Sequence, residues 1–123
     1  MKPRHGPPGW PQELPPPESA EFAPRAVLWL LDNAPPEFRG HDVFRRQPLV
    51  LAWLVTEYLD GAIGALRTSY ARVRAEFAAE LEPTALDAVL RAVEIEGVRL
   101  GRVRREVDMV AQALAGRVWK PRL

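Results

Sequence analysis

Residues 84–116 read TALDAVLRAVEIEGVRLGRVRREVDMVAQALAG, and this stretch decides the fold of the chain. Its apolar residues recur at steps of three and four, which is the spacing of a coiled-coil face on one long helix. The face that they predict runs through Leu86, Val89, Val93, Leu100, Val103, Val107, Val110 and Leu114. It has one polar position, Glu96. An apolar face of this length needs a partner helix to cover it.

The partner helix is predicted directly upstream, over residues 48–81. Pro48 suits the first position of a helix, and the apolar residues that follow recur about every 3.6 residues. Pro83 ends this helix, and Thr84 with Asp87 has the pattern of a helix cap. So short a linker makes the two long helices, 48–81 and 85–115, antiparallel.

A short helix is predicted over residues 23–33, ended by Pro35 and Pro36. In the connector that follows, we expect one turn from Pro36 to Gly40 and a second turn capped by Asp42. The first turns of helix 48–81 are apolar nearly all round, so this end should be buried under the short helix and the connector. The fold class is therefore all-α: a long helical hairpin with a short helix packed on its open end.

The amino-terminal residues 1–18 form a proline-rich arm, because most of the 13 prolines of the chain lie in its first 36 residues. Proline removes backbone donors, so this arm is predicted to be flexible or polyproline-like. Two alternatives remain: a docking ligand with the Pro8–Pro11 spacing, or an arm packed back on the helices by Trp10. The predicted organisation is the arm 1–18, one helical domain 19–116 and a tail 117–123 anchored by Trp119.

Composition indicates one folded domain in the cytoplasm. The chain has 123 residues, of which 47% are hydrophobic, with no cysteine and a net charge of +1. It has no signal peptide and no run of about 18 uncharged apolar residues, so no membrane span is expected. Nearly all of the 17 basic residues are arginine, which fits the coding bias of a GC-rich bacterium.

Chemistry-bearing residues are sparse, so the sequence predicts no enzyme, no metal and no cofactor. The two histidines, His5 and His41, lie in the arm and the connector, and no Glu-x-x-His pair is present. The serines, Ser19 and Ser69, belong to no nucleophile motif, and no glycine-rich phosphate loop occurs.

Three sets of residues remain as candidate sites. The first is an apolar edge that the hairpin does not use, consisting of Leu90, Ile95, Val98 and Met109. The second is an arginine face that suits phosphate or an acidic partner, consisting of Arg91, Arg99, Arg102 and Arg105. The third is a buried polar pair: folding the hairpin about its linker places Tyr70 opposite Glu96, although Glu96 can also point to solvent.

These features predict a non-enzymatic helical protein that self-associates or binds a larger protein assembly through the hairpin, near its turn. The alternative is a nucleic-acid-binding accessory factor that uses the arginine face. A third option is a small-molecule or lipid pocket lined by Trp29 and Trp53, between the short helix and helix 48–81.

Overall fold

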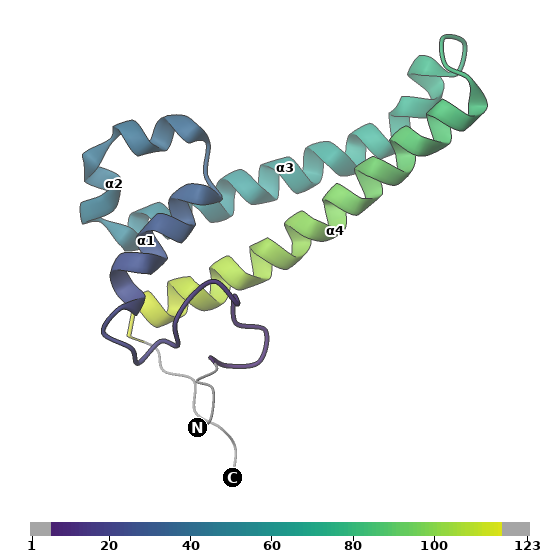
Figure 1. Ribbon diagram of the computed structural model, residues 1–123. Helices are drawn as coiled ribbons and strands as arrows, with labels where there is room; N and C mark the ends of the chain where they lie inside the picture. Colours follow the sequence, from purple (N-terminus) through teal and green to yellow (C-terminus); the bar gives the residue numbers. More distant parts are fainter. Residues whose placement is uncertain (1–5, 117–123) are drawn as a thin grey trace. The chain divides into compact units, whose positions relative to one another are not determined.

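The structure, a computed structural model, describes residues 6–116, and these are helical or irregular, with no strand among them. The elements follow in the order α1 (Phe22–Asp32), η1 (Pro36–Gly40), α2 (Asp42–Arg46), α3 (Pro48–Phe77) and α4 (Pro83–Leu114) (Figure 1). The helices α3 and α4 pack closely, which confirms the predicted helical hairpin. His5 and the tail 117–123 lie outside the described residues.

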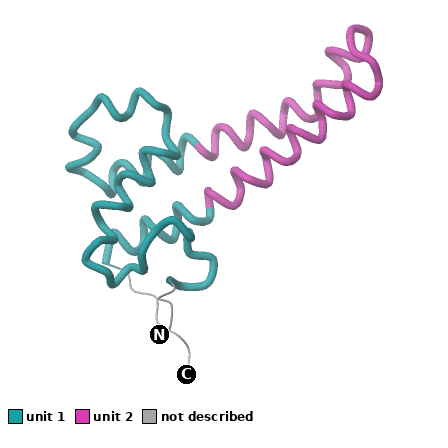
Figure 2. Tube along the Cα trace, viewed as in Figure 1, with its two compact units in different colours: residues 1–58, 105–123 teal, residues 59–104 magenta. Residues whose placement is uncertain are grey.

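The chain divides into two compact units (Figure 2). Unit 1 comprises residues 1–58 and 105–123, and unit 2 comprises residues 59–104. Both long helices pass through both units, so each unit holds a segment of α3 and a segment of α4.

Helix boundaries differ from the sequence-based expectation at two caps. Asp42 is the first residue of α2 rather than its cap, and its carboxylate instead pairs with Arg46 one turn later. The helix α4 begins at Pro83, because the amide of Leu86 already donates to the carbonyl of Glu82 at 2.9 Å. Thr84 is therefore inside the helix and does not cap it, since proline at the first helical position needs no hydrogen-bond acceptor.

Unit 1 is built around α1. The buried side chains of α1 include Ala26, Leu30 and Leu31, and its side chain Trp29 is almost fully buried as well. The same unit contains the buried residues Leu51, Ala52 and Val55 of α3 and Val107 and Val110 of α4. One segment each of α1, α3 and α4 thus contributes to an apolar core. Among residues 6–116, no side-chain nitrogen or oxygen is buried without a hydrogen-bond partner.

The proline-rich segment of unit 1 is folded around Trp10. The amide of Trp10 donates to the carbonyl of Pro7 at 2.9 Å, and Gly9 has φ +83°, the pattern of a type II turn. The indole Nε1–H donates to the carbonyl of Pro15 at 3.1 Å, and the indole ring lies 5.3 Å from the ring of Phe22. Trp10 therefore fixes the arm on α1, which is the packed-back alternative rather than an extended docking ligand.

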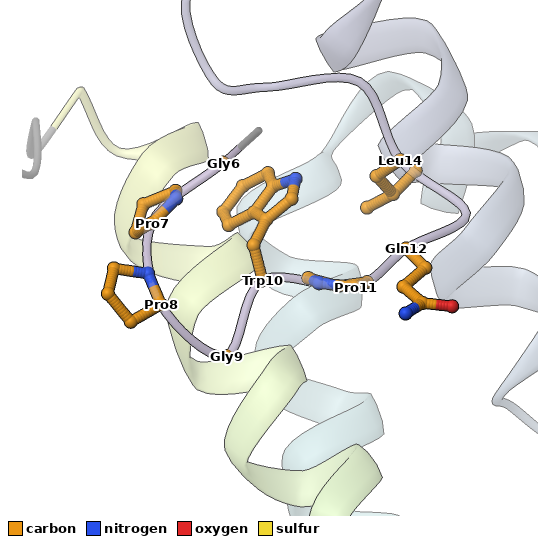
Figure 3. A pocket seen from close by; sticks show the side chains of 8 residues that line it. All are labelled: Gly6, Pro7, Pro8, Gly9, Trp10, Pro11, Gln12 and Leu14. Carbon is orange, nitrogen blue, oxygen red and sulfur yellow. The ribbon is translucent and has the colours of Figure 1, made fainter. Parts of the chain in front are cut away.

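Two glycines allow the arm to pack this tightly. A Cβ added at Gly6 would lie 2.2 Å from the indole of Trp10, so only glycine fits there. A Cβ at Gly9 would lie 3.5 Å from the sulfur of Met109, which places the turn against α4 within unit 1. Figure 3 shows the indole of Trp10 among the residues from Gly6 to Leu14, which line a pocket.

Unit 2 is a two-helix hairpin whose packing line on α4 keeps the predicted positions Leu86, Val93, Leu100 and Val103, which are buried or half-buried. Leu90 is buried and Gly97 is half-buried as well, each one residue after a predicted position. Val89 and Glu96, which the predicted line contained, are exposed. At these two positions the next residue is turned inward instead. This buries the larger side chain of Leu90 and keeps the carboxylate of Glu96 hydrated, so no desolvation penalty arises.

The helix α3 is the one described helix that is long and apolar enough to cross a membrane, judged by length and composition alone. Its apolar amino-terminal half contains the two acids Glu57 and Asp60. Asp60 is paired with Arg104 of α4 at 2.9 Å, so here the helix lies beside a charged partner helix.

Candidate interaction surface

The amino-terminal part of α3 in unit 1 exposes large apolar side chains to solvent. Trp53 is 61% exposed, and Leu49 and Val50 are about half exposed. Leu54 is partly exposed one residue after Trp53, and Tyr58 is half exposed one turn further on. We call this set, Leu49, Val50, Trp53, Leu54 and Tyr58, the α3 outer face.

The α3 outer face lies opposite the side of the helix that builds the core. Leu51, Ala52 and Val55 have no exposed surface, and they alternate along the chain with the exposed residues Val50 and Trp53. At 100° per residue the two sets occupy opposite arcs of the helix. Within residues 6–116, therefore, the outer face takes no part in the core of unit 1.

The expectation that the amino-terminal end of α3 is buried on all sides is thus wrong for the α3 outer face. The helix α1 covers one face only, and the connector does not cover the other: within it, Val43 is also exposed and Phe38 packs on Phe44 at a ring distance of 4.8 Å. The aromatic side chains of the connector therefore pack on each other and do not cover the α3 outer face. The predicted pocket between Trp29 and Trp53 is wrong for the same reason, because Trp29 is buried and Trp53 faces solvent.

The apolar edge predicted on the last helix is only partly a surface. Leu90 is buried in the packing line of unit 2, which removes it from the set. Met109 belongs to unit 1 and is half-buried, with its sulfur beside Gly9 of the arm. Ile95 and Val98 are indeed exposed, by 56% and 72%, on the side of α4 away from the packing line.

The predicted buried pair of Tyr70 and Glu96 is not present. Tyr70 is 45% exposed, and Glu96 accepts hydrogen bonds from Nε and Nη2 of Arg99 at 3.0 and 2.6 Å. The hydrogen bond from Arg99 lowers the pKa of the Glu96 carboxyl below its ordinary value. The same bond raises the pKa of the Arg99 guanidinium, so both groups are held in their charged forms. The solvent-facing alternative for Glu96 describes the structure.

The four arginines of the predicted phosphate face are all exposed on α4. Arg91, Arg99 and Arg102 belong to unit 2, and Arg105 is the first α4 residue of unit 1. Arg99 is occupied by Glu96, whereas Arg91, Arg102 and Arg105 have no ion pair within residues 6–116. The set therefore offers three exposed cations, without an aromatic side chain between them to stack on a base.

Titratable groups in the described part of the chain do not gather into a reactive site. Residues 6–116 contain no group of three histidine or acidic side chains placed to hold a metal ion. Glu57, Asp60, Glu94 and Glu96 are exposed, and Asp60, Asp87 and Glu96 each pair with an arginine. Ion pairs of this exposed kind arrange charge on a surface and do not tune a group for proton transfer.

The candidate sites expected from the sequence do not include the α3 outer face. The available signal was the apolar run from Leu49 to Val55, which is too apolar for a helix covered on one side. That signal indicates burial as readily as an exposed face, and only the covering elements distinguish the two.

No known protein family, curated protein or solved structure matches this chain. Function is therefore inferred from the surface itself.

Proposed function

We propose that this protein is a non-enzymatic helical interaction protein that binds another protein chain through the α3 outer face of its hairpin. The single observation that supports this is the solvent exposure of Trp53 among four other apolar side chains on one helix face. Contiguous apolar patches of this kind mark interaction sites on soluble proteins, and tryptophan is the residue most enriched among those that dominate binding energy.

The free energy gained by covering this apolar surface is sufficient for a specific contact. Covering about 100 Å² of apolar surface on Trp53 and its neighbours contributes about 2.5 kcal/mol, at roughly 25 cal/mol per Å². A partner helix that covers the whole face removes several times this area from water. Such a partner covers the outer face of α3, as the core of unit 1 covers its inner face.

A lipid bilayer fits this surface less well than a protein does. The helix α3 is apolar enough to enter a membrane, but it packs on α4, which carries charged residues through its whole length. Glu57 lies at the end of the outer face, and moving a carboxylate into hydrocarbon without a partner costs several kcal/mol. A protein partner can offer that carboxylate a cation.

A photo-crosslinking residue at position 53 of the full chain, introduced in growing cells, tests the proposal. The matched control carries the same residue at position 28, because Leu28 on α1 is 59% exposed, nearly as much as Trp53. We expect a discrete protein adduct from position 53 and none from position 28. Lipid adducts only, or the same adducts from both positions, would contradict the proposal.

A second candidate function rests on the unpaired arginines of α4. We propose nucleic-acid binding through Arg91, Arg102 and Arg105 as the alternative, supported by their exposure without an ion pair within the described chain. Phosphate contacts predict binding of duplex DNA or RNA that weakens steeply with salt. Replacing all three arginines by glutamate abolishes this binding if the alternative is right, whereas Trp53→Lys leaves it unchanged.

A further inference from the structure

We infer that the occupant of the α3 outer face is the same face of a second copy of this chain, in an antiparallel two-helix contact about a two-fold axis near Trp53. The inference rests on the proposed function and deepens it, because it names the partner. Its basis is the distribution of charge along the face.

The two ends of the α3 outer face carry opposite charges. Residues 43–56 contain no acid, and Arg45 and Arg46 precede the face at its amino end. Residues 47–66 contain no basic residue, and Glu57 stands at its carboxyl end. The dipole of α3 has the same direction, positive at the amino end. One exposed cation, Arg45, thus precedes the face, and one exposed carboxylate, Glu57, lies near its carboxyl end.

Arg45 and Glu57 have no oppositely charged partner within the described chain. The guanidinium of Arg45 donates to the carbonyl of Arg39 at 2.9 Å, which leaves its charge uncompensated. Arg46 already pairs with Asp42, and Asp60 already pairs with Arg104. Glu57 is exposed and makes no hydrogen bond or ion pair within residues 6–116.

Antiparallel self-pairing satisfies both charges at once. With the axis near Trp53, Leu49 of one copy lies across from Glu57 of the other. Arg45, four residues before Leu49 in α2, is the cation that we assign to that carboxylate. Both ends of a two-fold contact are equivalent, and two such pairs form. A parallel arrangement brings Arg45 beside Arg45 and Glu57 beside Glu57, which is repulsive. The charge pattern therefore selects one orientation.

The centre of the contact is aromatic. Because the axis lies near Trp53, the two indoles meet across it, flanked by Leu49, Val50 and Leu54 of both copies. Aromatic pairs in offset or edge-to-face contact stabilise an interface beyond the area that they bury. The apolar centre and the charged ends together have the anatomy of a protein–protein contact.

Sedimentation equilibrium of the purified full chain, over roughly 1 to 100 µM, tests the inference by mass action. We expect a monomer–dimer equilibrium that Trp53→Lys weakens at least tenfold and Leu28→Lys leaves unchanged. Arg45→Glu and Glu57→Arg should each weaken it about tenfold, and the double variant should recover most of the loss. Far-UV circular dichroism establishes that each variant is folded, and Glu94→Arg is the charge control on another exposed site.

Orientation is tested by crosslinking, which the absence of native cysteine makes unambiguous. Leu49→Cys and Glu57→Cys, the two positions that lie across from each other, are mixed and oxidised. They should form the mixed disulfide dimer faster than either variant alone forms its own dimer. Faster homodimer formation by each single variant would overturn the antiparallel arrangement. A chain that stays monomeric over the whole concentration range would overturn the inference altogether.

The same experiments distinguish failure of this inference from failure of the proposed function. If the purified chain is monomeric but the position-53 crosslinker captures a different protein, the second copy is excluded and the interaction function stands. If the position-53 crosslinker captures only lipid or nothing, both fall.

Discussion

Asp60 of α3 accepts a hydrogen bond from Nε of Arg104 of α4 at 2.9 Å, within unit 2. The pair is flanked by the buried residues Leu59 and Val103, the neighbours of Asp60 and Arg104 in sequence. Each charged side chain therefore lies at the edge of an apolar contact between the two helices. The pair joins α3 to α4 at this point by one charge-assisted hydrogen bond.

The first prediction concerns the energy of this pair. The side chains are 31% and 52% exposed, so solvent screens their attraction. A double-mutant cycle with Asp60→Asn and Arg104→Gln should give a coupling of about 0.5 to 1 kcal/mol in urea unfolding. In roughly 1 M salt the coupling should fall markedly. A coupling that salt leaves unchanged would show that the pair acts by geometry and not by charge.

The second prediction distinguishes the two possible packing lines on α4. Because Leu90 is buried, Leu90→Ala should lower the free energy of unfolding by about 2 to 4 kcal/mol. Val98→Ala, at a side chain that is 72% exposed, should change it by about 0.5 kcal/mol or less. Val89→Ala is the decisive comparison, since an effect as large as that of Leu90→Ala would restore the predicted line through Val89.

The third prediction concerns Gly97. A Cβ at Gly97 meets no atom within 4 Å, so the glycine is not required by a close approach of the helices. Gly97→Ala should therefore stabilise the protein by about 0.5 to 1 kcal/mol, the helix propensity difference. The control is Gly9→Ala, which should destabilise because Gly9 has φ +83°. Loss of stability in Gly97→Ala would indicate that the helices pack more closely here than the structure shows.

The fourth prediction concerns the arm. Trp10→Phe keeps an aromatic ring beside Phe22 but loses the hydrogen bond to the carbonyl of Pro15, and should cost about 1 kcal/mol. Trp10→Ala also loses the ring contact and should cost about 2 to 3 kcal/mol. Thermal unfolding of the full chain measures both. Equal stability of Trp10→Ala and the unchanged chain would mean that the arm does not contribute to unit 1.

The fifth prediction concerns the titration of Glu96. Its pKa is lowered from 4.5 by the hydrogen bond from Arg99, so the native state binds a proton less readily than the unfolded state. The stabilisation is present above the unfolded pKa and is lost as the pH falls through the native pKa, below about 4.5. In Arg99→Gln, NMR titration should find the pKa of Glu96 moved up towards 4.5. Tyr70→Phe should leave it unchanged, and a rise there would revive the Tyr70–Glu96 pair.

Local signals were enough to locate the helices. Proline at positions 35, 36, 48 and 83 marks their boundaries, since it removes a backbone donor and restricts the residue before it. The 3–4 apolar spacing of residues 84–116 and the short linker at Pro83 predicted the hairpin, and α3 and α4 do pack closely. These are properties of the chain over a few residues, which is why they can be read from it.

The choice between adjacent apolar residues was not local. Val89 and Leu90 both fit a helical face, and so do Glu96 and Gly97 for a line shifted by one residue. Which line is buried depends on the side chains of α3 that meet it, and therefore on the register of two helices. An apolar helix face is about 100° wide, so either Val89 or Leu90 can be the buried residue. The packing of α3 on α4 decides between them.

The sequence by itself determined that the chain is all-helical, where its helices begin and end to within a few residues, and that α3 pairs with α4. Only the tertiary structure decided that Trp10 folds the arm onto α1, that Leu90 is inside and Glu96 outside, and that Trp53 faces solvent. The physical reason is that helix formation depends on neighbours a few residues away, whereas exposure depends on what else covers the surface. For α3, one face is covered by the core of unit 1, and the other face is exposed in the described chain.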